Sequence, residues 1–116
     1  MKFGELIRKR REEKEITLRA FSKAVGLAAA YVSMMERGMN TPPGPEKIKR
    51  MAKVLELDPD ELMGAAKKVD PDVASILQSD PGFPEVLRTA REGNVNSEDL
   101  QKALDRLLAE RKRKSR

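Results

Sequence analysis

Three Asp-Pro pairs recur along this chain, at residues 58–59, 70–71 and 80–81. An aspartate side chain accepts hydrogen bonds from the free amides at a helix start, and proline fits the first helical position. Each pair precedes apolar residues at helical spacing, so each predicts a short helix. With three Phe, one Tyr and no Trp, the core must consist of Leu, Ile, Val, Met and Ala, which favours packed helices over sheets. The sequence therefore predicts an all-α fold.

Other signals divide the rest of the chain into helices. Thr17 can cap a helix over 18–25, and Gly26 can supply the left-handed residue that ends it. Further helices are predicted over 3–14, 28–37 and 46–56, and the Pro-rich segment 39–45 is an exposed connector. Ser97 is predicted to cap a last helix that ends where the basic run 111–116 begins.

Composition excludes many functions for a chain of 116 residues. It contains no Cys and no His, so disulfides, zinc sites built on thiolate or imidazole, and nucleophiles activated by imidazole are excluded. We expect no enzymatic activity, metal or cofactor. No apolar run reaches the length of a membrane span and no apolar signal region opens the chain, so we expect a cytoplasmic protein with no membrane contact.

The segments 18–25 and 28–37 carry the pattern of a helix-turn-helix. Such a motif needs a small residue in its first helix, a turn residue that tolerates positive φ, and apolar residues on the inner face of its second helix. Those requirements are met in order by Ser22, Gly26, Val32 and Met35. The agreement extends to the flanking Glu36-Arg37-Gly38 and Asp58-Pro59-Asp60-Glu61-Leu62.

Together with Arg11, Thr17 and Tyr31-Val32-Ser33, these motifs make residues 3 to about 64 resemble the lambda-repressor/Cro type of helix-turn-helix regulators, the XRE family. The resemblance implies a five-helix lambda-repressor-like DNA-binding domain whose third helix docks in the major groove of double-stranded DNA. It implies a sequence-specific transcriptional regulator, more specifically a repressor that binds a palindromic operator as a homodimer and is associated with the nucleoid.

The resemblance also assigns roles to individual positions. The base-facing residues of the recognition helix would be Ala29, Ala30 and Met34. These side chains can contact thymine methyl groups but lack the amide or guanidinium that reads adenine or guanine, so we expect readout mainly through phosphates, apolar contact and DNA shape. Two further departures from the family are Ala28, where a Ser or Thr cap is common, and Glu15, where glycine is common. The candidate phosphate contacts are Thr17, Arg19, Tyr31, Ser33, Arg37 and Asn40.

Arg11 lies on the core-facing stripe of the first helix and resembles the family arginine that pairs with the glutamate ending the recognition helix, here Glu36. A buried two-point ion pair would hold the third helix against the first. The alternative is a solvated arginine in a basic run.

Beyond residue 69 the expected organisation is a short helical extension over 70–109 and a flexible basic tail over 110–116. Basic residues outnumber acidic ones in 1–69 and in the tail, whereas acidic residues dominate 70–109, and the net charge is +5. The extension is expected to dimerise or to bind another protein. The candidate dimer-interface residues are Leu100, Leu104, Leu107 and Leu108. Alternatively, this stripe packs on its own chain beside residues 76–87.

Two other functions fit the same sequence. The chain could be the antitoxin of a toxin–antitoxin pair that regulates its own operon, with residues 70–116 wrapping a toxin. It could also be a protein-interaction module that no longer binds DNA, which the apolar recognition helix favours.

Overall fold

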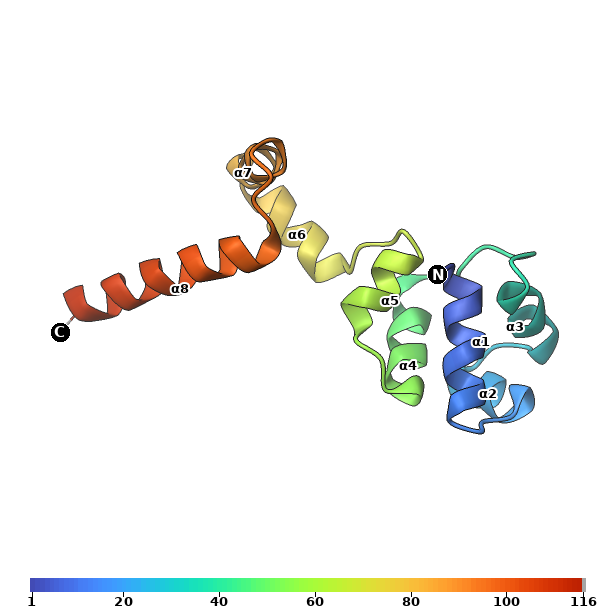
Figure 1. Ribbon diagram of the computed structural model, residues 1–116. Coiled ribbons are helices and arrows are strands. Elements are labelled where there is room, and N and C mark those ends of the chain that lie inside the picture. The colour runs from blue at the N-terminus through green and yellow to red at the C-terminus, as the bar shows by residue number, and fades with distance from the viewer. Residues whose placement is uncertain (116) are drawn as a thin grey trace. The chain divides into compact units, whose positions relative to one another are not determined.

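The computed structural model describes residues 1–115, which form eight α-helices and no strand (Figure 1). This confirms the all-α fold. The helices are α1 (Phe3–Glu13), α2 (Leu18–Val25), α3 (Ala29–Glu36), α4 (Pro45–Leu55), α5 (Pro59–Ala65), α6 (Pro71–Ser79), α7 (Gly82–Glu92) and α8 (Ser97–Lys114). None of these helices is long and apolar enough to cross a membrane.

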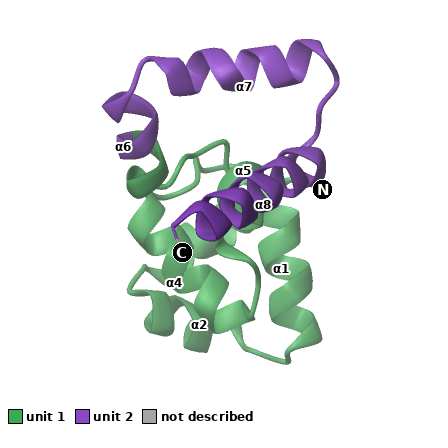
Figure 2. Cartoon of the chain, turned by 90° about the vertical axis from the view of Figure 1, so that its left-hand side faces the viewer, with its two compact units in different colours: residues 1–74 green, residues 75–116 purple. Residues whose placement is uncertain are grey.

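The chain divides into two compact units, residues 1–74 and residues 75–116 (Figure 2). The first unit contains α1 to α5 and the start of α6. The second contains the rest of α6 together with α7 and α8.

The first unit has one apolar core to which all five of its complete helices contribute. Helix α4 packs against α1, α2 and α5, while α3 packs against α1 and α2. Because α3 lies at the edge of this arrangement, only its inner face is buried and its outer face stays free. The fully or nearly fully buried side chains are Phe3, Ile7, Phe21, Val25, Val32, Met35, Ile48, Met51, Ala52, Leu55, Leu62 and Met63.

The predicted capping chemistry is present at four helix starts, since Asp70 and Asp80 also accept from the Asp72 and Gly82 amides, and it differs at the start of α8. Thr17 and Asp58 cap α2 and α5 through their side-chain oxygens, as expected. The cap of α8, however, is Asn96 and not Ser97: the Asn96 Oδ1 accepts from the Asp99 amide at 2.8 Å. The Asp99 carboxylate in turn accepts from the Asn96 amide at 3.3 Å. Asn96 is the cap because Asp99 stands three residues after it and completes a capping box.

The basic segment near the C-terminus is helical up to Lys114. The sequence predicted that the last helix would end where the basic run 111–116 begins, but α8 continues to Lys114. Arg and Lys are good helix formers, and their positive charges are favoured at the negative end of the helix dipole. Arg116, the last residue of the expected flexible tail, lies outside the described residues.

Glu15, which replaces the glycine common in the family, adopts a left-handed conformation with φ 55°. This conformation costs an L-residue about 1–2 kcal/mol and costs glycine nothing, although glycine gains more freedom in the unfolded chain. We therefore expect Glu15→Gly to raise the free energy of unfolding by roughly 0.5–1 kcal/mol, measured by urea titration. Glu15→Ala is the control, because it removes the carboxylate and keeps the strain. An equal gain in both variants would assign the effect to charge.

In the second unit, α7 and the start of α8 meet at a turn where Val95 donates its amide to the Ala90 carbonyl at 2.8 Å. Ala90 is the only buried residue of this unit among those described. The leucine stripe of α8 packs on its own chain only at its start: Leu100 is half-buried and lines a groove with Val86, whereas Leu104, Leu107 and Leu108 are exposed.

Candidate nucleic-acid interface

Helices α2 and α3 form a tight pair joined by a three-residue turn. The Thr17 hydroxyl accepts from the Ala20 amide at 3.1 Å and fixes the start of α2. Gly26 ends α2 with φ 71°, after which the Leu27 amide donates to the Ser22 carbonyl at 3.0 Å. A side chain at Gly26 would be strained by this φ and would also come within 2.9 Å of the Lys47 Nζ. The turn therefore directs α3 across α2.

The inner face of α3 is fixed by Val32 and Met35, which are buried in the core. Ser22 of α2 allows the close approach, because its small side chain is buried and its hydroxyl donates to the Leu18 carbonyl at 2.7 Å. Ala28 caps α3 without any side-chain hydrogen bond, so the first amides of α3 have no side-chain acceptor there. Free amides at a helix start favour a nearby anion.

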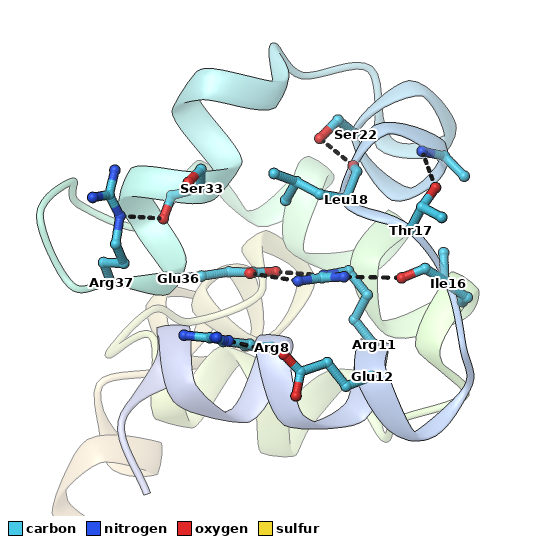
Figure 3. Close-up of polar contacts among 11 residues, drawn as sticks. Arg8, Arg11, Glu12, Ile16, Thr17, Leu18, Ser22, Ser33, Glu36 and Arg37 are labelled. Carbon is cyan, nitrogen blue, oxygen red and sulfur yellow. Dashed lines mark hydrogen bonds and ion pairs between the residues drawn. The ribbon is translucent and has the colours of Figure 1, made fainter.

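Arg11 and Glu36 form a two-point ion pair between α1 and the end of α3 (Figure 3). The Arg11 Nε lies 2.8 Å from the Glu36 Oε2, and the Nη2 lies 3.0 Å from the Oε1. The remaining Nη1 donates to the Ile16 carbonyl at 2.9 Å. The two side chains are only 12% and 5% exposed. The hydrogen bonds to Glu36 raise the pKa of Arg11, and the pair ties α3 to α1 at one fixed distance.

The outer face of α3 carries the three positions assigned to base contact. Ala29 and Ala30 are exposed in its first turn, and Met34 is half-buried one turn later. This face is small and apolar, so α3 can approach a surface closely but offers no side-chain hydrogen bond at these positions.

The six positions assigned to phosphate contact differ in their freedom to donate. Arg19 and Arg37 are exposed, whereas Ser33 and Asn40 are half-buried. The Tyr31 hydroxyl already donates to the Thr41 carbonyl at 2.6 Å, so it can only accept while that bond lasts. The Thr17 hydroxyl serves as a helix cap, and its hydrogen stays available to an acceptor.

A hollow of about 380 Å³ separates α1, α2 and α3 on this side of the unit. It is lined by Arg8, Arg11, Leu18, Ser33, Glu36 and Arg37. Arg8 is not among the predicted site residues; it stands one turn before Arg11 on α1 and binds Glu12 at 2.9 Å (Figure 3). Its only advance signal was the spacing of three residues from Arg11.

Two basic side chains of α4 are engaged by other groups of the same unit. Lys49 lies 2.7 Å from the Asp70 carboxylate, and this hydrogen bond raises the pKa of Lys49 and lowers the pKa of Asp70. Lys47 reaches the Gly26 carbonyl at 3.5 Å. Among residues 1–115 no group of acidic side chains is placed to hold a metal ion.

Comparison with known proteins agrees with this geometry. A family model described as Helix-turn-helix matches residues 7–62, which run from α1 into α5. This segment belongs to the helix-turn-helix family. The helix-turn-helix segment thus contains α2, α3 and both partners of the Arg11–Glu36 pair, and the family resemblance found in the sequence is confirmed.

Two curated relatives come from Bacillus subtilis (strain 168). The HTH-type transcriptional regulator RghRB is 31% identical over 91 residues, which cover 78% of this chain and 58% of RghRB. The HTH-type transcriptional repressor RghR is 34% identical over 68 residues, which cover 59% of this chain and 50% of RghR. The chain thus spans about half the length of the curated relatives it matches.

Two solved structures are also similar. The N-terminal DNA-binding domain of SinR from Bacillus subtilis is 28% identical, covers 53% of this chain and 88% of its own, and superimposes with a TM-score of 0.48. The crystal structure of SinR in complex with DNA is 28% identical, covers 53% of this chain and 97% of its own, and has a TM-score of 0.49.

Proposed function

We propose that this chain is a DNA-binding transcriptional regulator, more specifically a repressor that binds a palindromic operator as a homodimer. The observation that carries the proposal is the free outer face of α3, held at a fixed distance from α1 by the buried Arg11–Glu36 pair. The family of residues 7–62 and the repressor name of the relative RghR support the same conclusion.

In this proposal α3 lies in the major groove. Ala29, Ala30 and Met34 contact thymine methyl groups and let the helix approach closely, so operator selection relies on methyl contacts and on DNA shape. The hollow between α1, α2 and α3 receives a backbone phosphate, because Arg8, Arg37 and the start of α2 surround it. Phosphate contacts then supply most of the affinity.

Binding to a labelled fragment from upstream of the chain's own gene tests the proposal. We expect affinity to fall steeply with salt, and we expect Arg19→Ala and Arg37→Ala each to weaken binding and to reduce the slope of log K against log[salt] by about 1. Arg88→Ala in α7 is the matched control, because it removes an exposed arginine outside the helix-turn-helix segment. Fluorescence anisotropy at salt concentrations between about 0.05 and 0.3 M measures the slope.

The apolar outer face of α3 also suits a protein-interaction module, which is the second candidate. The same titration separates the two. A salt slope near zero, or no binding to the upstream fragment, would reject the DNA-binding proposal and favour the interaction module.

The homodimer is proposed to form through the stripe of α8, whose candidate residues are Leu100, Leu104, Leu107 and Leu108. Three of these side chains are 43–59% exposed, which is unusual for a leucine-rich face. Two copies related by a two-fold axis match the two-fold symmetry of a palindromic site.

A further inference from the structure

Helix α8 has an apolar stripe that is mostly uncovered within its own unit. Every residue from Gln101 to Ser115 is exposed, and Leu104, Leu107 and Leu108 are 50%, 43% and 59% exposed. These leucines follow each other at intervals of three and four residues or are adjacent, so they share one face. Most of the stability of a helix in a protein comes from the packing of its apolar face, so this exposed face favours an occupant.

A groove lies beside the N-terminal end of the same stripe. It encloses about 530 Å³ between α7 and the start of α8, and its apolar lining includes Val86, Ala90, Val95 and Leu100. Glu85 is the one charged residue among those that line it. The groove thus offers an apolar slot with a single negative charge at its wall.

The charges of α8 are unequally distributed between its ends. Glu98 and Asp99 occupy its first turn, whereas residues 111–114 at its other end are all basic. The acidic end adjoins the groove with Glu85, and the basic end is the far one. A second copy laid alongside in the opposite direction brings each basic end to the partner's acidic end. In a parallel pair Arg111 would instead face Arg111, and like charges would repel.

We propose that two copies of this chain pair through α8 in an antiparallel manner, with the basic end of each helix seated at the partner's α7–α8 groove. This pairing rests on the proposed homodimer and specifies its geometry. Full overlap aligns Ser97 with the partner's Lys114. Leu104 then lies opposite the partner's Leu107, and Arg111 lies opposite the partner's Leu100, within reach of the partner's Glu85.

Cysteine cross-linking reads this register directly, because the chain has no cysteine of its own. Full-length Leu100→Cys and Arg111→Cys chains are mixed in equal amounts, oxidised, and analysed by mass spectrometry and on a non-reducing gel. We expect the mixed disulfide to exceed both self-disulfides by about tenfold or more, because a disulfide needs Cβ atoms within about 4 Å. In the antiparallel pair, Arg111 and its own counterpart lie about 16 Å apart along the axis.

Lys102→Cys, on the opposite side of α8 from the stripe, is the control and should form no mixed disulfide with either variant. Predominant self-disulfides of Arg111→Cys would replace the antiparallel pair with a parallel one. Absence of any disulfide, with a monomer mass for the unaltered chain in sedimentation, would overturn the pairing altogether. DNA binding is measured on the same mixture of variants after its disulfides have been reduced. Retained DNA binding without cross-linking rejects only the pairing, whereas cross-linking without DNA binding rejects the proposed function.

Discussion

Replacing Glu36 with alanine is expected to lower the free energy of unfolding by about 3–5 kcal/mol, which is a large part of the stability of a small domain. The Glu36 side chain is only 5% exposed, and its two oxygens hold the Arg11 guanidinium at 2.8 and 3.0 Å. Removing the carboxylate leaves the largely buried Arg11 charge, only 12% exposed, with no ionic partner at this position and only the Ile16 carbonyl to accept from it. Chemical denaturation followed by circular dichroism measures the loss.

The surface pair Arg8–Glu12 provides the matched control for that experiment. Both of its side chains are more than half exposed, and its ionic contact is 2.9 Å. Glu12→Ala should therefore change the free energy of unfolding by no more than about 0.5 kcal/mol. If Glu36→Ala were as mild as Glu12→Ala, the Arg11–Glu36 pair would not be the device that holds α3. Arg11→Lys should also lower the free energy of unfolding, by less than Glu36→Ala, because lysine keeps the positive charge but cannot form the two-point contact.

Replacing Gly4 with alanine is expected to cost about 1–3 kcal/mol and to weaken DNA binding as well. A Cβ atom at Gly4 would collide with the Met35 carbonyl oxygen and would lie 2.8 Å from that of Glu36. Both obstacles are backbone atoms at the end of α3, so they cannot rotate away as a side chain could. The strain is relieved only if α1 and α3 move apart, which displaces the recognition helix.

Gly64→Ala in α5 is the control for Gly4→Ala, because a Cβ there meets nothing within 4 Å. It should raise the free energy of unfolding by roughly 0.5–1 kcal/mol, since glycine weakens a helix interior. Thermal melts and operator affinity measured on both variants check the contrast. Unchanged stability in Gly4→Ala would mean that the contact between α1 and α3 is looser than the structure shows.

The double variant Gly4→Ala, Glu36→Ala relates these two expectations. Both changes act on the contact between α1 and the end of α3, so their costs should not add. The free energy of unfolding is measured by the same denaturation curves. A combined loss smaller than the sum of the single losses would show that both substitutions disrupt the same contact.

Local signals allowed most helices to be predicted from the sequence. Thr17 and Asp58 are caps in the structure, and Gly26 ends α2, because each effect depends on residues within one helical turn. Ser97 was the wrong cap because two adjacent residues both suit the position, and only the pairing of Asn96 with Asp99 decides between them. The end of α8 was also wrong, since a run of basic residues is compatible with helix and with coil.

The sequence by itself determined where the helices lie and that α2 and α3 form a helix-turn-helix. It reached Arg11 and Glu36 only through the family resemblance, because they are 25 residues apart and no local rule joins them. Tertiary structure decided what depends on such distant contacts. It placed Gly4 against α3, engaged the Tyr31 hydroxyl and Lys49 within the unit, and left three of the four leucines of the α8 stripe exposed. Helix formation depends on residues that are close in the sequence, whereas the contacts and exposure of each side chain depend on residues that are close in space.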